Sequence, residues 1–76
     1  MKNVTQAYLL GIRDEREMLK AEIARGEGAL DRLSFARDML ASIKHTLAQG
    51  FAGEMAEYMR GGRDFWANQV RKEMAK

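Results

Sequence analysis

The sequence predicts an all-α protein, a small helical bundle, and three observations support this fold class. No proline occurs in the 76 residues, so the chain contains no side chain that blocks a helix. Apolar residues recur at helical spacing in three segments of similar length. Glycines separate the segments, and glycine is favoured where helices end and turns begin. We expect a single domain over residues 1–76, with helices at about 4–24, 29–49 and 52–75.

The first segment, residues 4–24, has a helix-start signal and a wide apolar arc. Asn3 suits the N-cap position, and Gln6 stands three residues later, at the spacing of a capping box. Four apolar side chains then share one face of a helix, at spacings of four, seven and four: Tyr8, Ile12, Leu19 and Ile23.

The second segment, residues 29–49, has the most regular apolar pattern. Its side chains alternate at spacings of three and four, which is typical of helices packed at a shallow crossing angle. We call this row the leucine seam, and it consists of Leu33, Ala36, Leu40, Ile43 and Leu47. Short joints favour antiparallel neighbours, so we expect the first two helices to form an antiparallel hairpin. A chain this short buries only about 60% of its unfolded surface, so we also expect a homodimer, with the seam available for core packing or self-association.

The third segment, residues 52–75, contains Gly61 and Gly62 in its middle. Helical phase continues through both glycines, because Met55, Met59 and Trp66 keep the same face. This continuity favours one helix. A kink, or a break into two shorter helices, is the alternative, since each glycine costs about 1 kcal/mol relative to alanine in a helix.

The composition argues against catalysis and against a bound metal or cofactor. The chain has no cysteine and one histidine, His45, and it contains no Glu-x-x-His pair of the kind used in helical-bundle metal sites. We expect His45 to face solvent, away from the leucine seam and from any nucleophile. We therefore expect no enzyme, no cofactor and no small-molecule substrate.

The charge pattern indicates a solvated surface. The net charge is +2 and the sequence pI is about 9.2, but acidic residues are interleaved with basic ones along the whole chain. Binding to nucleic-acid phosphates needs clustered positive charge, so we do not expect a nucleic-acid partner. No apolar run approaches the roughly 20 residues that span a membrane, and no secretory signal is evident. We expect a cytoplasmic protein.

The third segment carries the features of a partner-binding surface. Three of the six aromatic residues gather here beside arginines, and tyrosine, tryptophan and arginine dominate interface hot spots. The predicted partner-binding residues are Tyr58, Arg63, Phe65 and Trp66. Trp66 could instead belong to the core. Adjacent residues cannot share a helix face, so burying both Phe65 and Trp66 needs two contact surfaces, the second most easily supplied by another chain.

Residues 8–14 and the stretch from residues 50–55 to 63–66 resemble small helical proteins encoded by temperate bacteriophages, including inhibitors of host regulators and of host defences. The resemblance is one of size, helicity and composition, so it assigns no functional residue. It implies a helical dimer that occludes a host protein. We therefore expect a protein-binding inhibitor or adaptor. The alternatives are a small DNA-associated regulator and a structural subunit of a larger assembly.

Overall fold

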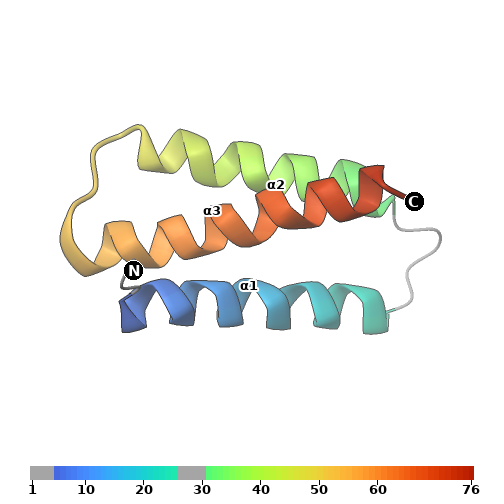
Figure 1. Ribbon diagram of the computed structural model, residues 1–76, viewed down its shortest axis with the longest axis horizontal. Coiled ribbons are helices and arrows are strands. Elements are labelled where there is room, and N and C mark those ends of the chain that lie inside the picture. The colour runs from blue at the N-terminus through green and yellow to red at the C-terminus, as the bar shows by residue number, and fades with distance from the viewer. Residues whose placement is uncertain (1–4, 26–30) are drawn as a thin grey trace.

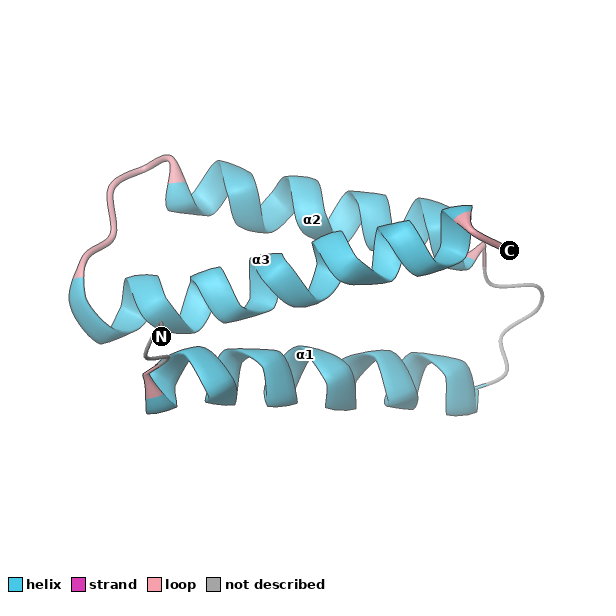
Figure 2. Ribbon diagram, in the orientation of Figure 1, coloured by secondary structure: helices cyan, strands magenta, loops and turns pink. Residues whose placement is uncertain are grey.

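The computed structural model describes residues 5–25 and 31–76, which form three α-helices and contain no strand. The helices are α1 (Gln6–Arg25), α2 (Arg32–Leu47) and α3 (Gly53–Met74) (Figures 1 and 2). The prediction of an all-α small helical bundle is confirmed.

The helix ends are set by local hydrogen bonds. Thr5 Oγ1 accepts from Tyr8 N at 3.1 Å and caps α1, whereas Asn3 and Val4 lie outside the described residues. Asp31 caps α2 by accepting from Ser34 N at 3.0 Å. The α2 start expected at residue 29 and the first joint, residues 25–28, fall largely on residues 26–30, which are also not described.

The joint between α2 and α3 lies where the glycines of the sequence predict it. Helix α2 ends at Leu47, two residues before the expected end, and Gly50 in the turn has a φ of 96°. L-residues rarely adopt this backbone conformation, so the turn requires glycine at this position. Helix α3 then begins at Gly53, one residue later than expected, and continues unbroken through Gly61 and Gly62. The prediction of a single third helix is confirmed.

Helix α3 lies between the other two helices. Within the described residues, α1 packs on α3 and α2 packs on α3, while α1 and α2 form no helix pair with each other. Figure 1 shows α1 and α3 running in the same direction, with α2 antiparallel to both. The expectation that the first two helices pair as a hairpin is therefore wrong. Helix α3 has a contact surface for each neighbour, so α1 packs on α3 instead of on α2.

The core is centred on Trp66, whose side chain is fully buried. Its ring packs edge-to-face against Phe35 of α2 and Phe65 of α3, with centroid distances of 5.6 Å and 5.0 Å. Of the leucine seam, Ala36 belongs to the buried core, and Leu40 and Ile43 pack against it. Leu33 and Leu47 are half-buried. The proposed role of the seam in self-association stays a prediction.

Candidate functional site

Helices α1 and α3 cross with their backbones in direct contact, at Gly11 and Gly61. A Cβ atom added to Gly11 would lie 2.0 Å from the carbonyl oxygen of Tyr58. A Cβ atom added to Gly61 would lie 2.0 Å from the carbonyl oxygen of Tyr8. Only glycine permits such an approach, which also brings each carbonyl within reach of Cα–H groups on the facing helix. We call this contact the helix crossing.

Two tyrosine–aspartate hydrogen bonds flank the helix crossing. Tyr8 Oη donates to Asp64 on one side, and Tyr58 Oη donates to Asp14 on the other. All four side chains are half-buried. The bond to Asp14, with burial and the Asp14 charge, raises the pKa of Tyr58 to about 12. The bond to Asp64 raises the pKa of Tyr8 as well. Both phenols therefore stay protonated at neutral pH and act as donors.

The two halves of the helix crossing have the same sequence signature. Residues 8–14 read YLLGIRD and residues 58–64 read YMRGGRD, so Tyr-x-x-Gly-x-Arg-Asp occurs twice at an offset of 50 residues. The contacts are reciprocal, since each glycine meets the carbonyl of the tyrosine on the other helix. Apolar periodicity does not reveal this signature, because its glycine, arginine and aspartate carry no hydrophobic signal. A search for internal repeats detects it.

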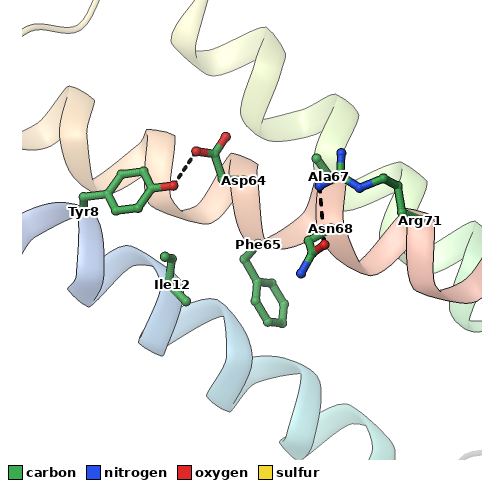
Figure 3. Close-up of a pocket in the computed structure, with 7 residues that line it drawn as sticks. All are labelled: Tyr8, Ile12, Asp64, Phe65, Ala67, Asn68 and Arg71. Carbon is green, nitrogen blue, oxygen red and sulfur yellow. Dashed lines mark hydrogen bonds between the residues drawn. The ribbon is translucent and has the colours of Figure 1, made fainter. Parts of the chain in front are cut away.

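A groove runs beside the helix crossing, between α1 and α3, with a volume of about 440 Å³ (Figure 3). Ile12 and Phe65 supply apolar surface on its two sides. Asn68 and Arg71 supply its polar edge, where Arg71 donates to Asn68 at 3.4 Å. Arg71 is exposed and makes no ion pair within the described part of the chain. Tyr8, Asp64 and Ala67 complete the lining.

The four predicted partner-binding residues do not form one surface. Phe65 is half-buried and lines the groove. Tyr58 is bonded to Asp14 and lines a separate hollow with Leu10 and Met55. Arg63 pairs with the neighbouring Asp64 at 3.0 Å.

Trp66 must be removed from the predicted partner-binding set, because no part of its side chain reaches solvent. The expectation that Phe65 and Trp66 need separate contact surfaces holds, but this chain supplies both surfaces itself. Trp66 packs in the core between the helices, and Phe65 reaches the groove beside α1 while its ring touches that of Trp66.

The side chain of Glu15 from α1 reaches the core beside Gly62 and Trp66. The indole Nε1 of Trp66 is buried and has no acceptor at hydrogen-bond geometry in the described residues. The Glu15 side chain passes over Gly62, where an added Cβ would lie 3.1 Å from Glu15 Cγ and 3.3 Å from Ile43 Cδ1. Burial raises the pKa of Glu15, and the indole N–H partly offsets this effect. Gly62 therefore makes room for side chains from both flanking helices.

No group of three His, Cys, Asp or Glu side chains in the described residues gathers in a way that could hold a metal ion. His45 is exposed, with Gln49 Nε2 3.2 Å from its Nε2 atom. None of the helices in residues 5–25 and 31–76 is both long and apolar enough to cross a membrane.

Comparison of the chain with protein-family models, with curated proteins and with solved structures finds no match in any of the three.

Proposed function

We propose that this chain is a non-enzymatic, cytoplasmic protein-binding module, an inhibitor or adaptor whose partner docks in the groove between α1 and α3. The observation that supports this most directly is the position of Phe65. Its ring lines an open groove and rests on Trp66, so a rigid core supports an accessible aromatic side chain. Aromatic side chains anchored in this way are typical of interface hot spots.

The groove also favours a particular kind of partner segment. Ile12 and Phe65 offer apolar contact, and Arg71 at the edge carries a positive charge that no carboxylate of the described residues neutralises. An apolar side chain with a carboxylate close to it in sequence would satisfy both features. Arginine suits this role because its guanidinium can bind a carboxylate through two parallel hydrogen bonds.

The test compares two phenylalanine truncations made in the same chain. Phe65 lies in the groove, whereas Phe51 is 44% exposed in the α2–α3 joint and lines a different hollow. Tagged wild type, Phe65→Ala and Phe51→Ala are used to capture proteins from a lysate of the source organism, after thermal melts establish that the baits are folded. We expect Phe65→Ala to lose the partner that wild type and Phe51→Ala retain. A hot-spot loss of about 2 kcal/mol corresponds to a roughly thirtyfold weaker affinity.

Arg71→Glu gives the second arm of this experiment. Reversing the charge at the groove edge should weaken capture of the same partner, and more strongly at low salt than at high salt. Equal recovery by wild type and Phe65→Ala, or no captured protein at all, would contradict the proposal. Binding of duplex DNA that disappears as salt rises from about 50 to 200 mM would instead support a DNA-associated regulator.

A further inference from the structure

We propose that the Tyr58–Asp64 face of α3 is a docking surface for the same face of a second copy of this chain, and that α1 covers it within the monomer. In the resulting dimer the two α3 helices would run parallel and cross at Gly61. Tyr58 of each copy would donate to Asp64 of the other. This inference does not depend on the partner groove proposed above.

The helix crossing has the symmetry of a two-fold interface. A two-fold dimer interface is formed by the same patch on both subunits, with each contact occurring twice. The contact between α1 and α3 already has this character. The added-Cβ distances to the facing carbonyl oxygen are 2.0 Å at both Gly11 and Gly61, and the tyrosine–aspartate bond occurs once on each side. It resembles a homodimer interface formed within one chain.

Helix α3 carries every group that the contact requires. The facing helix must offer a glycine, a tyrosine three residues before it and an aspartate three residues after it. In the whole sequence this combination occurs only at residues 8–14 and 58–64. Residues 58–64 of a second copy therefore present to α3 the same groups that α1 presents within the chain.

Release of α1 would uncover this face on a helix pair that retains packing of its own. Within the described residues, α1 pairs with α3 and not with α2. The packing of Trp66 on Phe35 and Phe65 lies within the α2–α3 pair and would remain. Helix α1 also places Leu19 in this core and packs Met18 against it, so its release would expose part of the core beside the Tyr58–Asp64 face.

Tethering decides which helix occupies this face. A helix joined by a short connection competes at an effective concentration of roughly millimolar. We therefore expect wild-type protein to keep this face covered by α1 and to remain a monomer at micromolar concentration, in contrast to the homodimer expected from the sequence. Weakening the attachment of α1 without altering α3 should produce the dimer.

The experiment uses two double variants that make equivalent substitutions, one on α1 and the other on α3. Tyr8→Phe/Asp14→Ala removes the α1 donor and acceptor, and Tyr58→Phe/Asp64→Ala removes those of α3. Both variants lose the same two intrachain hydrogen bonds. Both also lose an aspartate that pairs with the preceding arginine, at 3.4 Å for Asp14 and 3.0 Å for Asp64. Only the first variant retains the α3 groups that would pair with a second copy.

Sedimentation velocity from micromolar to near-millimolar protein gives the result, with circular dichroism to verify helix content. We expect Tyr8→Phe/Asp14→Ala to reach twice the 8.7 kDa chain mass at concentrations roughly tenfold or more below those at which wild type does so. The Tyr58→Phe/Asp64→Ala variant should remain at 8.7 kDa. Equal association of the two variants, whether both are monomers or both are dimers, would overturn the proposal, and so would loss of helix in the first variant without dimerisation.

Discussion

The two faces of α3 are packed in different ways. Towards α2 the contact consists of apolar side chains: Trp66 is fully buried, Ala36 fits against it, and Phe35 packs edge-to-face. Towards α1, at the helix crossing, the contact consists of two glycines and two polar hydrogen bonds. Beyond the crossing, α1 also adds Leu19 to the buried core and packs Met18 against it. Helix α3 therefore packs on α2 by hydrophobic burial, and on α1 by hydrophobic burial combined with a close backbone approach.

This difference has consequences for specificity. Apolar packing is tolerant, because hydrophobic side chains of similar volume can replace one another at small cost. The contact with α1 restricts the sequence more strongly. The two glycines of the helix crossing leave no room for larger residues, and each hydrogen bond needs its own donor and acceptor. The α2–α3 face thus tolerates apolar substitution, while the α1–α3 crossing determines which helix can dock. The following predictions test this contrast, from the largest expected effect to the smallest.

Truncating the core aromatic residue should have the largest effect on stability. Trp66→Ala removes a fully buried ring and leaves a cavity among the three helices. We expect the free energy of unfolding to fall by about 4 kcal/mol, as measured by urea denaturation monitored by circular dichroism. Phe51→Ala, at a site 44% exposed, serves as the control and should change it by less than about 1 kcal/mol. Comparable losses in the two variants would show that the core is not centred on Trp66.

Adding one methyl group at the helix crossing should also be costly. Gly11→Ala places a Cβ 2.0 Å from the backbone oxygen of Tyr58, so the two helices must separate. We expect the free energy of unfolding to fall by about 3 kcal/mol, because this clash outweighs the roughly 1 kcal/mol gained in helix propensity.

Gly62→Ala is the matched control for this substitution. Its added Cβ meets only Glu15 Cγ at 3.1 Å and Ile43 Cδ1 at 3.3 Å, and both are side-chain atoms that can shift. Because alanine also gains helix propensity, the free energy of unfolding of Gly62→Ala should stay within about 1 kcal/mol of wild type. Similar thermal melts for Gly11→Ala and Gly62→Ala would contradict the backbone contact at Gly11.

Alkaline pH should weaken the α1–α3 face selectively. Tyr58 has its pKa raised to about 12, first by the hydrogen bond to Asp14, then by burial and by the Asp14 charge. A tyrosine in the unfolded chain ionises near pH 10. The stabilising contribution is therefore complete below pH 10 and is lost as pH rises towards 12. Urea denaturation between about pH 9 and pH 11 should show this decline, and Tyr58→Phe should make it shallower. An identical decline in both proteins would contradict the assignment.

Much of the fold could be predicted from local sequence. The regular spacing of Leu33, Ala36, Leu40, Ile43 and Leu47 identified α2 and its packed face. Unbroken phase across Gly61 and Gly62 identified α3 as a single helix. The pairing of the helices was not predictable in this way. Short joints favour adjacent antiparallel helices, and they contain no information about the helix crossing between α1 and α3.

The candidate site was predicted only in part. Phe65 was correctly assigned to a face different from that of Trp66, and it lines the groove. Ile12, Asn68 and Arg71 were missed, because the groove joins residues from α1 and α3 that only the tertiary structure brings together. For Trp66 the sequence predicts a binding surface and leaves the core as the alternative, because hot spots and cores prefer the same large aromatic residues. The burial of the side chain in the structure distinguishes a core residue from an interface residue, whereas the residue type does not.

The helix crossing also bears on the order in which the chain folds. Its two hydrogen bonds join residues separated by 56 and 44 positions, whereas α2 and α3 are consecutive helices joined by residues 48–52. Contacts between distant residues require closure of longer loops and form more slowly than local ones. The α2–α3 pair should therefore form first, and α1 should dock last and leave first. A newly made or partly opened chain would then pass through a state in which the Tyr58–Asp64 face of α3 is not covered by α1.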